Sequence, residues 1–137
     1  KRASVDAKYF DWPLVLCNKT RECANVVCGM QVIGDVKGKD VILVDDIVDT
    51  AGTITMAANL MKEKGANSVR AIASHCVMSG PASERIQDSV IEEMVFTDSI
   101  PYSNRCAKVK QLTIAGMFAE TIRRVENNES ISDQYLV

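Results

Sequence analysis

The sequence predicts an α/β fold with a mostly parallel central sheet and helices on both faces. Apolar runs of strand length alternate with segments of helical periodicity. Each strand is apolar throughout, as expected for a parallel sheet that is covered on both sides. The 137 residues, 47% of them hydrophobic, have the length and composition of one globular domain.

The elements can be placed along the chain. The predicted strands are apolar runs, and they are residues 13–17, 28–35, 40–46, 68–77, 91–100 and 109–114. The predicted helices are residues 1–10, 53–66, 79–89 and 115–128. Residues 18–27 are polar and predict a loop. Gly65 stands where a C-cap glycine belongs, and Ser79 and Pro81 are suited to the N-cap and first turn of the third helix.

Composition excludes several classes of function. The formal net charge is −2 and no basic block is present, so the chain lacks the charge pattern of a nucleic-acid-binding protein. No apolar run approaches the roughly 20 residues that span a bilayer, and the first residues show no signal-peptide pattern. The five cysteines form no C-x-x-C pair and there is one histidine, which argues against zinc. We expect a cytoplasmic protein with reduced thiols and no membrane partner.

Residues 41–55, VILVDDIVDTAGTIT, carry the clearest chemistry. Asp45 and Asp46 follow an apolar run, at the carboxyl end of the predicted strand, where parallel sheets bind ligands. The small-residue turn 50–53 opens a helix, and N–H groups at a helix start bind anions. Carboxylates accept hydrogen bonds from sugar hydroxyls and bind Mg²⁺. The loop favours a ligand with a phosphate at one end and a diol at the other, such as a phosphorylated pentose.

Two other interpretations of this loop are open. Asp49 could cap the helix while the two preceding aspartates are solvated residues at a strand end. A receiver-type phosphoacceptor also places aspartates at strand ends. However, the later strands show no convincing acceptor aspartate, and a receiver would leave the Thr-Ala-Gly-Thr turn unexplained.

These residues resemble a known family. The stretch VILVDDIVDTAGTIT resembles the phosphoribosyl pyrophosphate-binding loop of the type I phosphoribosyltransferase fold. Together with SHCVMSGPASERI, TDSI and the terminal SIS, it makes nearly the whole chain similar to the C-terminal half of the ribose-phosphate pyrophosphokinases, or phosphoribosyl pyrophosphate synthetases. The resemblance implies that residues 1–137 are the C-terminal domain of a longer two-domain protein. The opening residues, which look like the second half of a helix with no initiator methionine, agree with this expectation.

The resemblance implies an activity and a set of site residues. In that family the C1 hydroxyl of ribose 5-phosphate attacks the β-phosphorus of MgATP and AMP leaves. Asp45 and Asp46 would hold the ribose hydroxyls and the Mg²⁺ ion. The residues that would surround the 5-phosphate are Asp49, Thr50, Ala51, Gly52 and Thr53. Since its carboxylate would repel the phosphate, Asp49 is expected to orient the loop.

The family's catalytic loop follows the first strand and carries a lysine and, two residues later, an arginine. Lys19 and Arg21 match this pair. An arginine can clamp phosphate oxygens in a bidentate fashion, and a lysine supplies a compact charge. Taken without the resemblance, both would be solvated loop residues. The chain departs from many bacterial members at Thr20, Glu22 and Cys23, where those members have a denser basic, proline-containing stretch.

The tail matches another feature of the family. Ser130, Ile131 and Ser132 correspond to a segment that in many members joins a regulatory phosphate or ADP site between subunits, the alternative being a frayed polar terminus. The implied partners are ribose 5-phosphate, ATP and further copies of the chain, in a hexamer built of dimers. Nucleic acid is not an expected substrate. For His75 we expect a structural role.

Two other functions are alternatives to this enzyme. A non-catalytic homologue that regulates an active synthetase would tend to lose the basic pair or the acidic loop, and both are present. A phosphoribosyltransferase would need a hood for its base, and the region after the last strand shows none. In the family the active site lies between two similar domains, so we expect this chain alone to be inactive.

Overall fold

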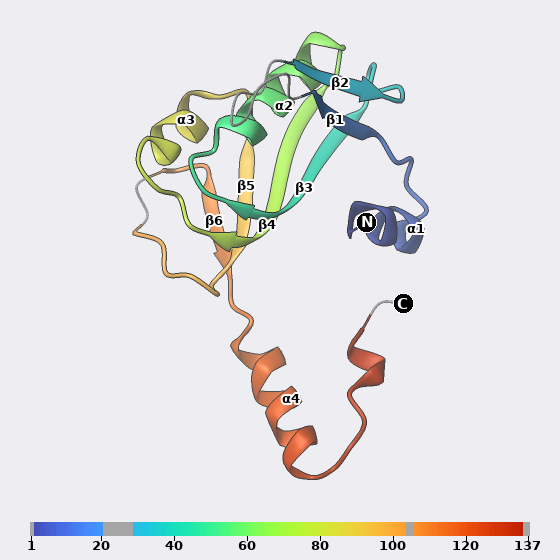
Figure 1. Cartoon of the computed structure of the whole chain (residues 1–137), viewed down its shortest axis with the longest axis vertical. Coiled ribbons are helices and arrows are strands. Elements are labelled where there is room, and N and C mark those ends of the chain that lie inside the picture. The colour runs from blue at the N-terminus through green and yellow to red at the C-terminus, as the bar shows by residue number, and fades with distance from the viewer. Residues whose placement is uncertain (1, 21–28, 104–105, 136–137) are drawn as a thin grey trace.

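The computed structural model describes residues 2–20, 29–103 and 106–135 (Figure 1). The helices are α1 (Arg2–Phe10), α2 (Gly52–Glu63), α3 (Ala82–Asp88), α4 (Ala115–Glu126) and the short 3₁₀ helix η1 (Ser132–Gln134). The strands are β1 (Leu16–Thr20), β2 (Gly29–Ile33), β3 (Asp40–Val48), β4 (Ser68–Cys76), β5 (Glu93–Thr97) and β6 (Val109–Leu112). Among these described residues, no helix combines the length and apolarity needed to cross a bilayer.

The main sheet has four parallel strands in the order β3-β4-β5-β6. The chain therefore crosses over in the same direction from β3 to β4 and from β4 to β5. Crossovers between parallel strands are right-handed, so two steps in one direction place their helices on the same face of the sheet. α2 and α3 make these crossovers and pack against each other on one side (Figure 1). The strands β1 and β2 form a separate antiparallel pair.

The hydrophobic core lies between the main sheet and these two helices. From α2 it takes Ile54, Ala58 and Met61, and from α3 it takes Ala82 and Ile86. Facing them are the buried strand residues Val69, Ala71, Met94, Phe96 and Val109. Because alternate strand residues point to one face, β4 buries Val69 and Ala71 while Arg70 and Ile72 between and after them are exposed.

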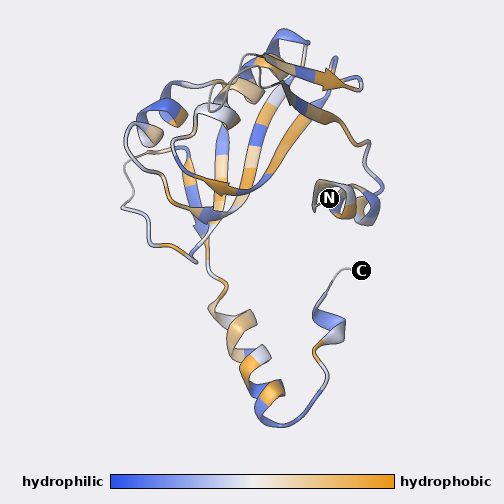
Figure 2. Ribbon diagram, viewed as in Figure 1, coloured by the Kyte–Doolittle hydropathy of each residue, from blue (hydrophilic) through white to orange (hydrophobic). Residues whose placement is uncertain are grey.

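Part of the opposite face of the sheet is open. Ile42 in β3 is 44% exposed and Ile72 in β4 is 39% exposed, although α1 contacts β3. α4 extends away from the sheet, and none of its residues is buried (Figure 1). Its apolar residues Met117, Phe118 and Ile122 are more than half exposed. Figure 2 shows hydrophobic residues both along the strands and on this outlying helix.

The predicted α/β class, with a parallel sheet flanked by helices, is confirmed. The prediction of a buried strand at residues 13–17 is wrong. The strand begins at Leu16, which is 53% exposed, and it continues through residues 18–20, which were predicted to be a loop. An apolar run does not say which sheet a strand will join, and here it joins β2. The remaining predicted helices and strands are present, with ends shifted by several residues.

The helix ends show one correct prediction and one error. Gly65 has a φ of 92°, its N–H donates to Lys62 O, and the next N–H, of Ala66, donates to Met61 O. These two bonds form the Schellman arrangement that a C-cap glycine permits. Ser79 is not the N-cap of α3, because Pro81 holds that position and the Ser79 hydroxyl bonds to Asp49 instead.

A pair of matched substitutions tests whether the core lies on one face only. Ile86→Ala removes a fully buried side chain and is expected to lower the free energy of unfolding by about 2–5 kcal/mol. Ile42→Ala makes the same chemical change on the open face and is expected to cost no more than about 1 kcal/mol, since that side chain already contacts water. Urea unfolding measures both. Equal losses would mean that the open face is covered in solution.

Candidate functional site

The acidic loop lies at the carboxyl end of β3 and leads into α2. The strand continues through Val48, so Asp45 and Asp46 lie inside it rather than at its end. A cavity of about 290 Å³ is lined by residues 45–54. The structure thus brings together all seven residues that were predicted to hold a sugar phosphate: Asp45, Asp46, Asp49, Thr50, Ala51, Gly52 and Thr53.

The turn at the centre of the loop has a left-handed backbone. Ala51 is the N-cap of α2, with φ 60° and ψ 1°, and is 4% exposed. This conformation costs a residue other than glycine about 1–2 kcal/mol. The surrounding structure must therefore hold the turn, and strain of this kind is common at functional sites. The Thr55 hydroxyl contributes by donating to Ala51 O at 2.9 Å.

The turn presents backbone donors. Within the described part of the chain, the N–H groups of Ala51, Gly52 and Thr53 donate to no acceptor. The first N–H groups of any helix lack partners within the helix, and together with the helix dipole they attract anions. Gly52 has no side chain to cover them. The loop can therefore donate several hydrogen bonds to one phosphate.

The connection between β4 and α3 holds the loop in place. Val77 N–H and Met78 N–H both donate to Val48 O, at 3.1 and 3.0 Å. Ser79 N–H donates to Asp49 O at 3.1 Å, and its hydroxyl bonds to the Asp49 carboxylate.

These contacts bear on the capping interpretation of Asp49. It does not cap α2, since the helix has no side-chain cap bond, so the capping interpretation is wrong. The Asp49 carboxylate bonds to the Ser79 hydroxyl, and its expected role of orienting the loop stays a prediction.

Sequence reasoning missed Arg85. Its guanidinium reaches across from α3, and Nη1 donates to Thr50 O at 2.8 Å. A single arginine on an exposed helix face carries no pattern that would have marked it.

The carboxylates fit Mg²⁺ only with help from a ligand. Among the described residues there is no group of three or more histidine, cysteine or acidic side chains that could hold a metal ion. Mg²⁺ is commonly bound by one or two carboxylates, substrate oxygens and several retained waters. Asp45 and Asp46 could supply two such carboxylates, and they line the same cavity as the turn at residues 50–53.

The structure describes the backbone of one member of the predicted catalytic pair, Lys19. Lys19 is in β1, where its backbone pairs with Met30 of β2. Arg21 belongs to residues 21–28, which lie outside the described residues, as do Glu22 and Cys23. The structure therefore places the start of the predicted loop on an antiparallel strand pair. The side-chain contacts of Lys19 and Arg21 lie outside what the structure describes.

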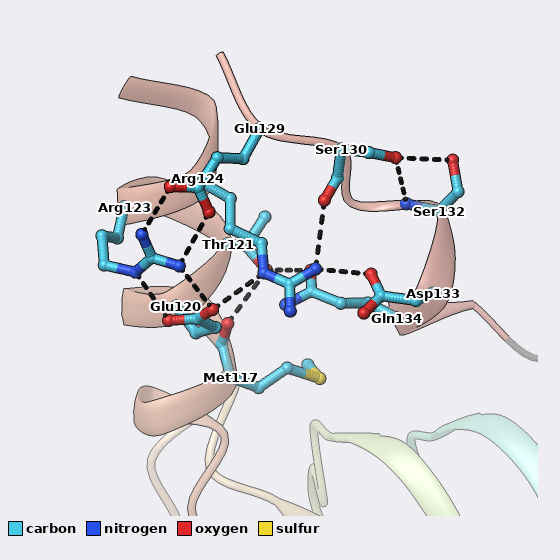
Figure 3. A network of polar contacts seen from close by, with 10 residues as sticks. All are labelled: Met117, Glu120, Thr121, Arg123, Arg124, Glu129, Ser130, Ser132, Asp133 and Gln134. Carbon is cyan, nitrogen blue, oxygen red and sulfur yellow. Dashed lines mark hydrogen bonds and ion pairs between the residues drawn. The ribbon is translucent and has the colours of Figure 1, made fainter. Parts of the chain in front are cut away.

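The tail segment 130–132 is distant from the acidic loop, beyond α4 (Figure 1). It is held by ion pairs, as Figure 3 shows. Arg124 donates to Glu120 at 2.8 Å, to Ser130 O at 3.0 Å and to the carboxylate of Asp133. Arg123 lies between Glu120 and Glu129, at 2.9 and 2.8 Å. The polar tail is therefore folded back onto its helix and not frayed.

The other sequence predictions concern single residues. His75 Nδ1 lies 2.9 Å from the hydroxyl of Ser99, so the histidine has a local partner, as expected for a structural role. Burial raises the pKa of the Cys76 thiol to about 11, which makes it a poor nucleophile at neutral pH. Cys106 is also buried as a free thiol, and its Sγ bonds to Gln87 at 3.4 Å.

Acid is expected to release the tail from α4. Hydrogen bonds from Arg123 and then Arg124 lower the pKa of Glu120 to about 2. A hydrogen bond from Arg123 lowers the pKa of Glu129, and one from Arg124 lowers the pKa of Asp133. Each carboxylate therefore stabilises the folded tail above its unfolded pKa. That stabilisation is lost as the pH falls from about 4.5 toward 2.

Amide chemical shifts of residues 130–135, followed against pH, measure this release. We expect them to move together below pH ~4, where the unfolded carboxylates protonate. Arg124→Gln should release the tail already at neutral pH. Unchanged tail shifts in that variant would contradict the role of the ion pairs.

Comparisons with known proteins identify the family of the chain. The family model described as phosphoribosyl synthetase-associated domain matches residues 17–136. A ribose-phosphate pyrophosphokinase from Porphyromonas gingivalis is 60% identical over 98% of this chain and 43% of its own length, and one from Campylobacter jejuni is 50% identical over 98% and 44%.

A solved structure, the phosphoribosylpyrophosphate synthetase from Mycobacterium smegmatis, aligns with a TM-score of 0.81 and 38% identity over 93% of this chain and 42% of its own. The chain thus spans less than half the length of the relatives it matches. From the matched domain and these identities, the chain belongs to the ribose-phosphate pyrophosphokinase family.

Proposed function

We propose that this chain is the C-terminal domain of an enzyme that makes phosphoribosyl pyrophosphate. The enzyme transfers the diphosphoryl group of MgATP to the C1 hydroxyl of ribose 5-phosphate and releases AMP. This domain supplies the ribose 5-phosphate site and the catalytic loop. The observation that carries the proposal is the cavity at 45–54, where undonated N–H groups and carboxylates line one space.

The two halves of the cavity suit opposite ends of ribose 5-phosphate. The N–H groups of residues 51–53 donate to the phosphate oxygens, and the hydroxyls of Thr50 and Thr53 are close enough in sequence to add further donors. Asp45 and Asp46 accept hydrogen bonds from the ring hydroxyls. With both ends held, the C1 hydroxyl has a defined direction. Such positioning supplies much of the rate enhancement in phosphoryl-type transfers.

Charge is the main obstacle to this reaction. The ligand phosphate and three aspartates are negative, and ATP brings further negative charge. Mg²⁺, when bound by Asp45 and Asp46 with substrate oxygens, neutralises part of it. We propose that Lys19 and Arg21 bind ATP. An arginine fork and a lysine ammonium can neutralise the negative charge of the diphosphoryl group during its transfer. Closure of their loop over ATP would exclude water.

The full-length protein is proposed to be a cytoplasmic homo-oligomer, a hexamer built of dimers. The exposed apolar residues of α4 support the idea that it packs against other protein surface, since patches of this kind mark interaction sites. The tail residues Ser130, Ile131 and Ser132 are proposed to join a regulatory phosphate or ADP site in that assembly. Their folded backbone favours this role over a frayed terminus.

Binding of ribose 5-phosphate with Mg²⁺ should stabilise the 137-residue chain. At a hundredfold excess over Kd, a ligand that binds only the folded state adds about 2.7 kcal/mol, which thermal unfolding detects. Gly52→Val should abolish the stabilisation, because its side chain covers the N–H groups that meet the phosphate. The variant should still fold. A Cβ at Gly52 would meet Arg85 Nη1 at 3.6 Å and the Thr50 hydroxyl at 3.9 Å, which are ordinary contacts.

The matched control is Gly116→Val, which makes the same change in α4, where a Cβ meets nothing within 4 Å. This variant should respond to the ligand like the wild type. Ribose and inorganic phosphate, tested separately, should each stabilise less than the joined molecule. Equal stabilisation of Gly52→Val and wild type would place the ligand elsewhere and contradict the proposed site.

Turnover should require more polypeptide than this chain. We expect no AMP from the 137-residue chain with ribose 5-phosphate and MgATP. AMP should form when the chain replaces the matching segment of the Campylobacter jejuni relative, to which it is 50% identical. A coupled assay for AMP measures both. Clear turnover by the chain alone would overturn the proposal that it holds only part of the active site.

A further inference from the structure

The segment that follows β4 donates hydrogen bonds to the backbone carbonyl groups of the acidic loop. Three successive carbonyl groups of the loop, those of Val48, Asp49 and Thr50, accept hydrogen bonds from this segment. The Val48 and Asp49 carbonyls accept three bonds from the backbone N–H groups of residues 77–79. The Thr50 carbonyl accepts its bond from the side chain of Arg85, with Nη1 2.8 Å from Thr50 O.

The Arg85 bond determines the direction of the Ala51 N–H, which is a candidate hydrogen-bond donor to a phosphate. None of the described peptide bonds is cis, so the C=O of Thr50 and the N–H of Ala51 point in opposite directions across the same peptide plane. A guanidinium that holds the carbonyl on the α3 side therefore turns the N–H to the other side. That N–H has no acceptor among the described residues, and Ala51 lines the cavity.

Arg85 makes this contact although an acidic side chain, that of Asp88, is near it on the same helix. Asp88 lies three residues further along α3, a spacing at which arginine and aspartate commonly pair on a helix. Within residues 2–20, 29–103 and 106–135, however, Arg85 makes no ion pair. Its guanidinium reaches back to a carbonyl 35 positions earlier in the chain. A hydrogen bond from a charged donor also polarises the peptide and strengthens its N–H as a donor.

We propose that Arg85 is a positioning residue for the phosphate of the sugar phosphate, acting through the Thr50–Ala51 peptide and not by touching the ligand. The inference rests on the proposed function of the loop. Arg85 keeps the strained turn at Ala51 in the geometry that presents its N–H, and it places one positive charge behind a loop that carries three aspartates. Loss of the Arg85 side chain would weaken binding of the phosphate group of the sugar phosphate while leaving the fold intact.

The test compares three variants of the 137-residue chain by calorimetric titration with ribose 5-phosphate and Mg²⁺. Arg85→Gln removes the charge, and Arg85→Lys keeps the charge without the fork. Arg70→Gln is the matched control. It removes the same charge from the far end of β4, where Arg70 lies 3.7 Å from Glu92. The amide resonance of Ala51 is recorded in each protein without ligand.

We expect Arg85→Gln to raise Kd about tenfold, the effect of losing one charge-assisted hydrogen bond, and Arg85→Lys to recover part of the loss. Melting temperatures should stay close to that of the wild type because Arg85 is exposed. The Ala51 amide resonance should shift in Arg85→Gln and stay in place in Arg70→Gln. A merely structural role would lower the melting temperature without this specific shift.

The outcomes separate the two proposals. Wild-type binding that is unchanged in Arg85→Gln overturns the positioning role and leaves the proposed function standing. Absence of wild-type binding counts against the proposed function of this loop. In that case the Ala51 resonance tests the positioning role of Arg85 separately. An unchanged resonance in Arg85→Gln overturns that role as well.

Discussion

The parallel pairing of β3 with β4 is the constraint on which the candidate site depends. In this register Val48 lies beside Cys76, so both strands deliver their next residues to the same end of the sheet. The acidic loop and the β4–α3 connection are then neighbours, although they are about 30 residues apart in sequence. Backbone bonds from Val77, Met78 and Ser79 follow directly from that proximity. They precede the left-handed turn at Ala51, a conformation that persists only where the surrounding structure holds it.

The order of the strands explains both the core and the exposed surface. A sheet built by successive right-handed steps in one direction receives its crossover helices on one face. α2 and α3 occupy that face and bury Phe96 and Met94 beneath them. The connection from β5 to β6 contains no helix among its described residues, so it adds no cover to the other face. Ile42 and Ile72 remain accessible there, and α4 keeps its apolar residues in water.

Charge has different roles at the two ends of the molecule. Near the C-terminus, Arg123 and Arg124 of α4 pair with carboxylates that are close in sequence, and these pairs hold the tail on the surface of the helix (Figure 3). Individual exposed pairs contribute little, but several in one network can order a short segment. In the loop, Arg85 binds the carbonyl group of Thr50 and makes no ion pair among the described residues. Neither arrangement buries a charge.

Local sequence by itself determined the elements that have their own start and stop signals. The helical spacing after Thr53, the glycine at position 65 and the apolar run before Asp45 predicted α2, its Schellman end and β3, because these depend on backbone preferences and nearby contacts. The set of loop residues was predictable for the same reason: all seven are contiguous or nearly so in the chain.

Only the tertiary structure decided which strands share a sheet, which face is covered and what holds the loop. The run at residues 13–17 is apolar, yet its strand is shifted and pairs with β2, since strand partnership depends on contacts between distant segments. The Ser79 hydroxyl binds Asp49 and does not cap a helix, and Arg85 turns to Thr50 and not to Asp88. These choices depend on distances across the fold, which local sequence patterns do not encode.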